Sequence, residues 1–423
     1  MRGAFRSRLS PFWRQAGALI GGNAAAHLIS GLSVLLLPRL FADADFGRYG
    51  WFSASLAVLA VVVNGGYDLA VMLPADAAAA RRLVLLSLRI AAAVAGLTLL
   101  AALLHLSPLG PVPGVPPGAW LLWLPLSLAL EGAYQPLRVW ANRQQAYGLL
   151  SASRLARALG TLGVSMLLGW AGAGAWGLAA GWTAGQAAGL LPLLRRLLPQ
   201  LRGQPAGAAR AERRAFADFP RYAVAGSLLH TASRYLPVYL LLPAFGEALA
   251  GQFSQADRIL SLPVTVIAMA IGQVFYEQAG RAAHAGTAEL KTLVRRTLRR
   301  LALIGAACFV PVLLLGPWLF RMALGDAWAD AGRYAQWLAP WMYLAFIASP
   351  LAYLVDVTRR LGEFLRFNAV FFLLRLAVLA WGARNGGADA AIAAFAAASA
   401  AGTALQLGYL LRLPARAGRP QAA

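Results

Sequence analysis

Apolar blocks of membrane-spanning length recur along the whole chain, and this pattern constrains the fold more than any other feature. A helix needs about 20 apolar residues to cross a bilayer. Only 13% of the 423 residues are charged, against about 25% in a typical soluble domain. The blocks also lack the alternation of a membrane β-barrel. The sequence therefore predicts an all-α polytopic membrane protein with about 12 transmembrane helices. The predicted spans cover residues 17–40, 49–73, 83–106, 119–140, 152–170, 174–194, 222–243, 250–276, 300–320, 334–356, 367–384 and 388–411.

The distribution of basic residues predicts the orientation of these spans. The net charge is +22, and all but one of the 38 Lys and Arg residues are Arg. Most of them fall in segments on one side of the spans, and short loops rich in Arg stay cytoplasmic. Both termini are therefore expected in the cytoplasm. One predicted cytoplasmic segment contains Arg138, Arg143, Arg154 and Arg157, whereas the opposite side carries only Arg39, Arg48, Arg321, Arg333 and Arg384.

The basic excess is mainly a topology signal, so we expect contact with anionic lipids rather than with nucleic acid. Residues 277–300 combine Leu at helical spacing with Arg, which predicts a helix on the membrane surface before the ninth span. Trp341 is among the aromatic residues expected in an interfacial belt.

An internal repeat divides the chain. The segments LLLPRLFADADFGRY and LLLPAFGEALAGQF each run from an odd-numbered span into an even-numbered one. Pro38 and Gly47 in the first correspond to Pro243 and Gly251 in the second, and the two glycines are 204 residues apart. Parallel repeats of this kind are a transporter architecture, although Leu-Pro and Gly can also recur by chance in Leu-rich spans. We expect these four residues, together with Pro263, to act as hinges or turns.

The repeat predicts two pseudo-repeated lobes of six helices each. We place an N-terminal lobe at residues 1–200 and a basic cytoplasmic linker at 201–219. A C-terminal lobe at residues 220–411 and a cytoplasmic tail at 412–423 complete the chain.

Charged residues inside the predicted spans define the candidate site. A charge at membrane depth costs at least about 3 kcal/mol, so a chain that keeps one there usually uses it. Arg234 follows Tyr222 by 12 residues, which places it about 18 Å deep, near the midplane. We assign an anionic headgroup to Arg234, Arg258, Arg375 and His230, because guanidinium groups suit phosphate. Ion coupling or charge balance is assigned to Glu131, Asp257 and Asp68.

The alternative is that these charged residues simply pair between helices, and that His230 makes an ordinary helix–helix contact. Asp257 and Arg258 are adjacent in the sequence, so they point in different directions on a helix and need not pair with each other.

The sequence carries no signature of an enzyme. It has no Gly-rich phosphate loop followed by Lys-Ser or Lys-Thr, no spacing of metal ligands and no credible nucleophile triad. Cys308 is the single cysteine. We therefore expect neither metal nor cofactor, with H⁺ or Na⁺ as candidate coupling ions.

Three stretches of the chain resemble the bacterial polysaccharide (O-antigen type) flippases. The run FADADFGRYGWFSASLAVLAVVVNGGYDLAVMLP is similar to their N-terminal signature, through Phe46, Gly47, Tyr49 and the Gly66-Tyr67-Asp68 sequence. The stretch from Pro220 to Ala279 looks like the family's seventh and eighth spans, and LFRMALGDAWADAGRYAQWLAPW resembles the outer loop after span nine.

This resemblance implies membership of the superfamily of multidrug, oligosaccharidyl-lipid and polysaccharide exporters. It implies two six-helix lobes around a central cavity, in the bacterial cytoplasmic (inner) membrane. The implied substrate is an undecaprenyl-diphosphate-linked oligosaccharide, moved from the inner to the outer leaflet for lipopolysaccharide O-antigen or similar surface glycans. Implied partners are membrane lipids and the polymerase or glycosyltransferases of the same pathway.

Other functions remain open at this level. A cation-coupled multidrug exporter of the same superfamily predicts an acid-rich pocket, which the excess of Arg in the spans disfavours. A membrane polysaccharide polymerase or ligase usually needs a large outer loop that carries catalytic groups, and the sequence has none.

Overall fold

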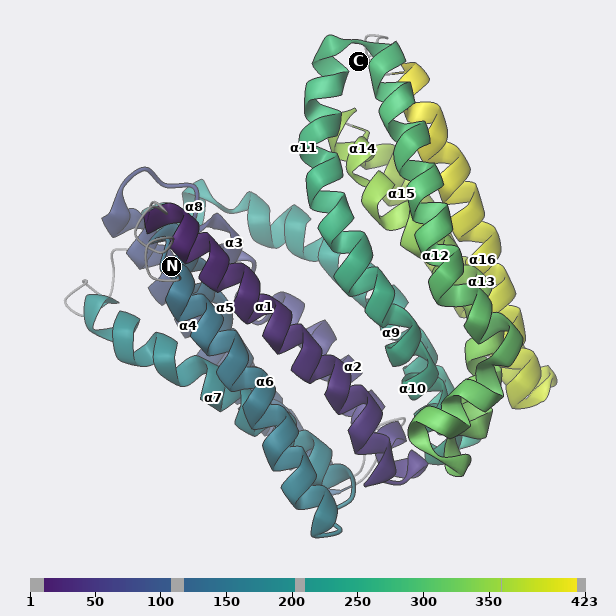
Figure 1. Ribbon diagram of the computed structural model, residues 1–423. Helices are drawn as coiled ribbons and strands as arrows, with labels where there is room; N and C mark the ends of the chain where they lie inside the picture. Colours follow the sequence, from purple (N-terminus) through teal and green to yellow (C-terminus); the bar gives the residue numbers. More distant parts are fainter. Residues whose placement is uncertain (1–10, 108–117, 202–209, 359, 417–423) are drawn as a thin grey trace, which may run out of the picture. The chain divides into compact units, whose positions relative to one another are not determined.

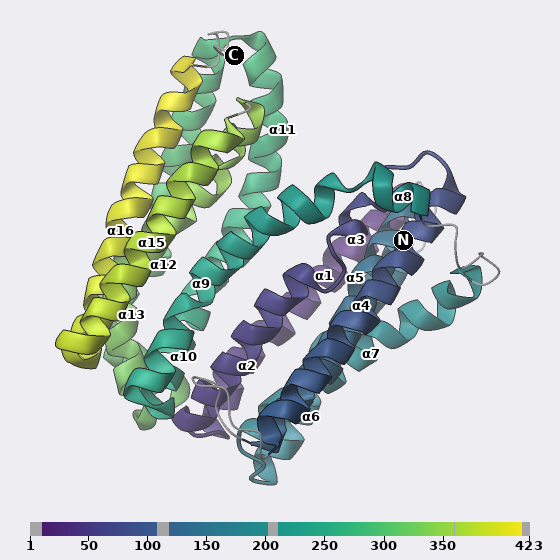
Figure 2. The ribbon, with the colours of Figure 1, turned by 180° about the vertical axis from the view of Figure 1, so that it is seen from behind.

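The computed structural model describes residues 11–107, 118–201, 210–358 and 360–416, and these ranges are helical with short connections (Figures 1 and 2). Parts of the predicted linker and tail, residues 202–209 and 417–423, lie outside the described residues. The α-helices are α1 (Pro11–Leu36), α2 (Asp43–Val62), α3 (Tyr67–Ala70), α4 (Ala77–Leu106), α5 (Trp123–Arg143), α6 (Tyr147–Trp170), α7 (Ala175–Leu201), α8 (Arg210–Ala215), α9 (Val224–Phe245), α10 (Glu247–Pro263), α11 (Met269–Ala285), α12 (Thr287–Leu324), α13 (Ala329–Leu351), α14 (Tyr353–Val357), α15 (Leu361–Asn385) and α16 (Gly387–Arg412). Short 3-10 helices cover Leu37–Arg39, Ala119–Leu122, Asp326–Trp328 and Leu413–Arg416, and π-helical turns cover Phe219–Ala223 and Val264–Ala268.

The predicted spans fall on helical stretches, which confirms the all-α membrane fold, although α2 in the second span already ends at Val62, before the predicted end at residue 73. Within the part of the chain that the structure describes, seven helical stretches are long and apolar enough to cross a membrane: Gly21–Arg39, Ala77–Leu106, Glu247–Ala283, Thr287–Leu324, Asp326–Val357, Gly362–Asn385 and Gly387–Ala415. The other five predicted spans correspond to α2, α5, α6, α7 and α9, which have 20, 21, 24, 27 and 22 residues. These lengths suffice for a bilayer of about 30 Å.

The chain forms two compact units, Met1–Ala232 and Ser233–Ala423, which meet within α9. The spans α1, α2, α4, α5, α6 and α7 belong to the first unit. The second contains most of α9, the α10–α11 stretch, α12, the α13–α14 stretch, α15 and α16. The linker that we placed at residues 201–219 stays a prediction.

Glycines on α7 bring it close to α6 in the first unit. Gly181, Gly185 and Gly189 recur at every fourth position and so share one face of the helix. A Cβ atom on Gly185 would lie 1.9 Å from Oγ1 of Thr161 and 2.7 Å from the carbonyl oxygen of Arg157. Small residues promote this close approach between membrane helices, where apolar burial alone drives little association.

The second spans of the two units start alike and continue differently. Each begins on an acidic residue, Asp43 in α2 and Glu247 in α10, where a negative charge suits the helix N-terminus. In the first unit α2 ends at Val62 and the chain turns through Gly65 and Gly66, both with positive φ. In the second unit the helix continues through the π-helical turn Val264–Ala268 into α11.

The predicted surface helix within residues 277–300 is wrong as a separate element. Helix α12 starts at Thr287, directly after the Gly286 turn, and continues to Leu324. Leu290 and Val294 are buried in its first turns, because the apolar face packs inside the second unit rather than on a membrane. The helix bends instead at Leu315, whose φ of −125° is not helical, between Pro311 and Pro317.

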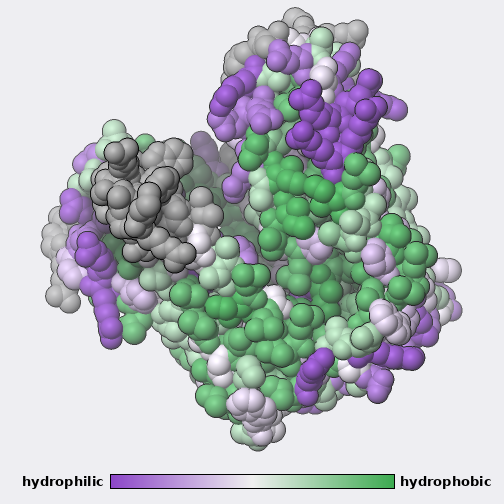
Figure 3. All heavy atoms as spheres, in the orientation of Figure 1, coloured by the Kyte–Doolittle hydropathy of each residue, from purple (hydrophilic) through white to green (hydrophobic). Residues whose placement is uncertain are grey.

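The surface of the second unit has the polarity expected of a membrane protein. On the face shown in Figure 3, hydrophobic residues cover its middle and hydrophilic residues lie toward its ends. Exposed apolar side chains include Leu303, Leu314, Val370 and Leu373, which are 61–75% accessible. Such a contiguous apolar surface is stable in lipid and costly in water.

Candidate functional site

An ion pair joins α9 and α10 in the second unit. Nη2 of Arg234 on α9 donates a hydrogen bond to Oδ2 of Asp257 on α10, over 3.1 Å. The side chains keep 36% and 23% of their accessible surface. Both residues were predicted site residues, and the structure brings them together. The pairing alternative thus holds for Arg234 in this structure, and its side chain stays partly exposed.

Arg375 on α15 is bound differently, by aromatic rings. Its guanidinium carbon lies 5.0 Å from the ring centroids of Trp341 on α13 and Phe371 on α15. A cation over a ring face gains about 0.5–2 kcal/mol, and the gain is larger where water is excluded. Among the described residues, no carboxylate lies within ion-pair distance of Arg375 and its buried Nε has no hydrogen-bond partner. The charge that acts on it is that of Arg234, which repels it.

The aromatic ring under Arg375 is itself held in place by its neighbours. Phe371 stacks on Phe367 at 5.6 Å between centroids. A Cβ atom on Gly402 of α16 would lie 1.0 Å from Cζ of Phe371, so only glycine leaves room for this ring. The seat of Arg375 is thus built by α13, α15 and α16 together.

The two other predicted binding residues lie on the same helices as the ion pair. Arg258 follows Asp257 on α10 and is half-buried. His230 lies one turn before Arg234 on α9, and its side chain is exposed. Its role as a ligand stays a prediction.

The first unit contains another partly buried ion pair between spanning helices. Oε2 of Glu131 on α5 lies 3.5 Å from Nη2 of Arg157 on α6, with side-chain exposures of 15% and 32%. Gln135 donates a hydrogen bond to the other carboxylate oxygen of Glu131. The guanidinium of Arg157 also lies 5.3 Å from the ring of Tyr134 and 5.4 Å from that of Trp182. Glu131 was a predicted site residue, whereas Arg157 was counted with a cytoplasmic segment; the structure places it inside α6 and beside Glu131.

Asp68 is buried on the short helix α3, and Arg138 is the charged group that acts on it. The irregular chain that follows is held by Arg143, whose Nη1 donates hydrogen bonds to the carbonyl oxygens of Val71 and Met72. Asp68 therefore lies beside the end of the second span, and its coupling role stays a prediction.

The expected hinge residues lie at varied places in the helices. Gly47 and Gly251 are each the fifth residue of a helix, in α2 and α10, rather than residues of a turn. The turn before α10 falls on Gly246, whose φ is 85°. Pro38 is the second residue of the 3-10 helix Leu37–Arg39, and Pro243 lies two residues before the end of α9.

Pro263 is the proline that coincides with a change of helix type. It ends α10, and the π-helical turn Val264–Ala268 follows at once. Proline has no N–H, so the carbonyl four residues earlier loses its usual helical donor. Single π turns inside helices are frequent at functional sites.

Sequence reasoning missed the aromatic rings that contact Arg157 and Arg375. Trp341 was expected in an interfacial belt, but it lies near the middle of α13 and only 7% of its surface is accessible. Its distance from the helix ends could have revealed this, because belt residues lie at the interfaces. Arg157 lies inside the predicted span 152–170, and that position was the available signal.

Among the described residues, no group of His, Cys, Asp and Glu could hold a metal ion.

A model of the polysaccharide biosynthesis protein family matches residues 36–333, which is more than half of the chain. The chain belongs to this family. No curated protein matches the sequence closely enough to count.

Solved structures of transporters share the fold of this family member. The structure of "Lipid II flippase MurJ, inward closed conformation" matches with a TM-score of 0.66 at 11% identity, over 93% of this chain and 90% of that one. A MATE protein in complex with MaD5 matches at 0.62 and 14% identity, over 92% and 94% of the two chains. A MOP superfamily transporter from Pyrococcus furiosus matches at 0.59 and 12% identity, over 95% and 94%. The fold is thus that of the MOP superfamily transporters, which confirms the two-lobe architecture of about 12 spans.

Proposed function

We propose that this protein is a flippase, not an enzyme, and that it moves an undecaprenyl-diphosphate-linked oligosaccharide from the inner to the outer leaflet by alternating access. The family match supports a role in polysaccharide biosynthesis. The observation that carries the proposal is the excess of cations in the second unit. Arg234 has one acidic partner, Asp257, and Arg375 has an aromatic seat without a carboxylate among the described residues.

An uncompensated guanidinium inside a membrane protein costs free energy, so its retention points to a charge that arrives from outside. A diphosphate supplies that charge, and Arg offers it a planar face of several N–H donors. We infer that Arg234 can leave Asp257 to join Arg375 on the same anion, because its side chain is already partly exposed. The carboxylate of Asp257 then remains to bind H⁺ or Na⁺, the candidate coupling ions.

The protein would act in the bacterial inner membrane with both termini in the cytoplasm, as the distribution of Arg predicts. Surface glycans of the O-antigen or lipopolysaccharide type are the proposed end product. The polymerase and glycosyltransferases of the pathway are the proposed partners, because they make and use the same lipid-linked intermediate.

The test is Arg375→Gln, which removes the charge but keeps a polar side chain of similar length. We expect export of surface glycan to fall at least about thirtyfold in cells that carry only this variant, as loss of a buried charge contact predicts. Arg384→Gln is the matched control, because Arg384 is an exposed arginine on the same helix α15. Membrane levels of each variant are measured by immunoblot. Full surface glycan with Arg375→Gln would contradict the proposal.

A cation-coupled multidrug exporter is the second candidate, because MATE proteins share the fold and Asp257 and Glu131 are half-buried carboxylates. This candidate predicts that cells without the protein become sensitive to cationic drugs and keep normal surface glycan. The flippase predicts the reverse, so measuring both properties in the same strain separates the two functions.

A further inference from the structure

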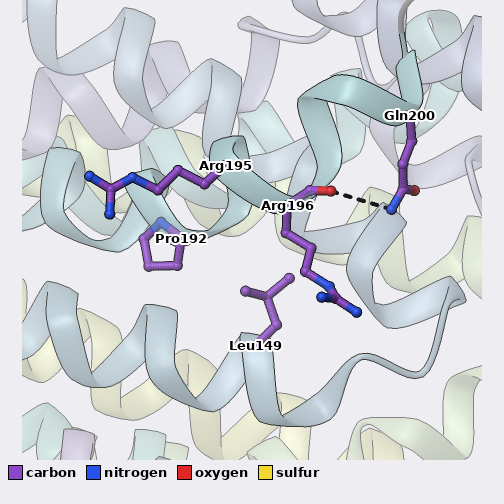
Figure 4. Close-up of a pocket in the computed structure, with 5 residues that line it drawn as sticks. All are labelled: Leu149, Pro192, Arg195, Arg196 and Gln200. Atoms are coloured by element: carbon purple, nitrogen blue, oxygen red, sulfur yellow. Dashed lines mark hydrogen bonds between the residues drawn. The ribbon is translucent and has the colours of Figure 1, made fainter.

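A cationic pocket lies at the end of α7 in the first unit. It has a volume of about 550 Å³ and is lined by Leu149, Pro192, Arg195, Arg196 and Gln200. Leu149 comes from the first turn of α6, and the other four come from the last turns of α7 (Figure 4). In Figure 4 the side chain of Arg195 extends past Pro192, whereas that of Arg196 extends toward Leu149.

The pocket offers positive charge without an internal counter-ion. Both arginines are exposed, and no described carboxylate lies within ion-pair distance of either. The amide of Gln200 is already used: its Oε1 accepts from Nε1 of Trp140 at 3.3 Å, and its Nε2 donates to the carbonyl oxygen of Arg196 at 3.3 Å. The donors that remain for a ligand are therefore the two guanidinium groups, which select for an anion.

The depth of the pocket places it at a membrane interface. Arg195 follows the start of α7 at Ala175 by 20 residues, which is about 30 Å along a helix and equals the thickness of the hydrocarbon core. This is the end of α7 that the distribution of Arg predicts to be cytoplasmic. A ligand bound here would have its charge in the headgroup region.

Apolar residues continue from the pocket along α7. Leu191, Arg195 and Leu198 are spaced by four and three residues and so share one face of the helix. The two leucines are 45% and 41% accessible. An acyl chain can lie on this face while its headgroup meets the arginines, and Leu149 and Pro192 add apolar surface inside the pocket.

We propose that this pocket binds the phosphate headgroup of an anionic phospholipid and so anchors the α6–α7 pair in the membrane. Basic pockets between spanning helices are suited to such headgroups. Because the two guanidinium groups extend in different directions, a lipid with two phosphates engages both more readily than a lipid with one. The inference concerns an annular lipid and does not depend on which cargo the protein moves.

The test is a titration of the full-length protein in detergent, followed by native mass spectrometry. The probes are cardiolipin, with two phosphates, phosphatidylglycerol, with one, and zwitterionic phosphatidylethanolamine. Glycerol 3-phosphate serves as a free phosphate without acyl chains. We expect tight binding in the order cardiolipin, phosphatidylglycerol, phosphatidylethanolamine, and no retention of glycerol 3-phosphate.

Two variants test the pocket in different ways. Arg195→Gln with Arg196→Gln removes the charge, and Leu149→Trp fills the pocket without a change of charge. Each should weaken cardiolipin binding at least about tenfold. Arg295→Gln with Arg296→Gln is the control, because these exposed arginines on α12 remove the same charge elsewhere.

Three results would overturn the inference. Equal weakening by the control would show that bulk charge attracts the lipid rather than the pocket. Unchanged binding by either pocket variant would place the lipid elsewhere. Retention of glycerol 3-phosphate as strongly as of cardiolipin would assign the pocket to a soluble phosphate compound. A Leu149→Trp protein that elutes as a monodisperse peak on gel filtration excludes misfolding as the cause of a loss.

Discussion

The two units keep an arginine at corresponding places and balance its charge differently. Arg157 lies on the fifth spanning helix of the first unit, and Arg375 on the fifth of the second. Each is seated on an aromatic ring of the fourth spanning helix, Tyr134 in one unit and Trp341 in the other. One turn before the ring, however, the first unit has Glu131 and the second has the fully buried Leu338.

The difference between Glu131 and Leu338 decides whether the arginine has an acidic partner one turn before the ring. In the first unit the carboxylate neutralises the arginine, and both become part of the helix packing. In the second unit the acid is on α10 and pairs with Arg234, and no carboxylate of the described residues lies within ion-pair distance of Arg375. Both units thus seat an arginine on a ring of the preceding spanning helix, whereas the ion pair to that arginine is seen in the first unit.

The largest expected effect comes from disrupting the close packing of α6 against α7 in the first unit. Gly185→Leu puts a side chain where a Cβ atom already lies 1.9 Å from Thr161 and 2.7 Å from the carbonyl of Arg157. Overpacking of this kind costs about 1–3 kcal/mol or more, so we expect little folded protein in the membrane. Gly163→Leu is the control, because no atom lies within 4 Å of a Cβ at that exposed site. Gel filtration with fluorescence detection measures both, and equal yields would disprove the close contact.

Charge exchange should separate the two ion pairs. Glu131→Arg with Arg157→Glu keeps an ion pair in the first unit, and we expect it to restore most of the export lost by either single change. Arg234→Asp with Asp257→Arg also keeps a pair but moves the cation away from Arg375, so export should stay at least about thirtyfold below normal. Surface glycan is the readout, and Arg234→Ala alone should abolish it while insertion stays normal. If both charge exchanges restored export equally, the two ion pairs would not differ in the way proposed.

A new acid in the second unit should convert it toward the first. Leu338→Glu places a carboxylate one turn before Trp341, where it can pair with Arg375. We expect export to fall about tenfold or more, because the cation is then neutralised without substrate. Leu338→Gln has nearly the same shape without charge and reports the cost of a polar group in the core. If the two variants export alike, charge is not the cause.

The smallest effect concerns a helix end in the first unit. The carboxylate of Asp76 accepts hydrogen bonds from the backbone N–H groups of Ala78 and Ala79, which lower its pKa below the ordinary 3.8. A lowered pKa stabilises the fold above pH 3.8, and this contribution is lost as the pH falls through the folded value. Asp76→Asn keeps the cap without the charge. We therefore expect the unfolding temperature of the unchanged protein to be slightly higher than that of Asp76→Asn at pH 7, and equal to it at pH 3. A difference in unfolding temperature that stays the same at both pH values would instead indicate a change in packing.

The sequence by itself determined the membrane fold and the candidates for the site. Apolar blocks of about 20 residues allow only helices in lipid, because every backbone N–H and C=O must be satisfied within the segment. A charge inside such a block stands out in the same way, and this identified Arg234, Asp257, Glu131 and Arg375. Gly47 and Gly251, which are 204 residues apart, also occupy equivalent positions in the structure, since each is the fifth residue of a helix.

Only the tertiary structure decided which charges meet. Helix rotation and close approach set the partners, and these depend on packing such as that of Gly185 on Thr161. The sequence could not show that Arg157 reaches Glu131, nor that Trp341 lies beneath Arg375 rather than at an interface. A pairing between residues far apart in sequence is fixed by the contacts of whole helices, whereas the cost of a charge in lipid is local and can be read from one segment.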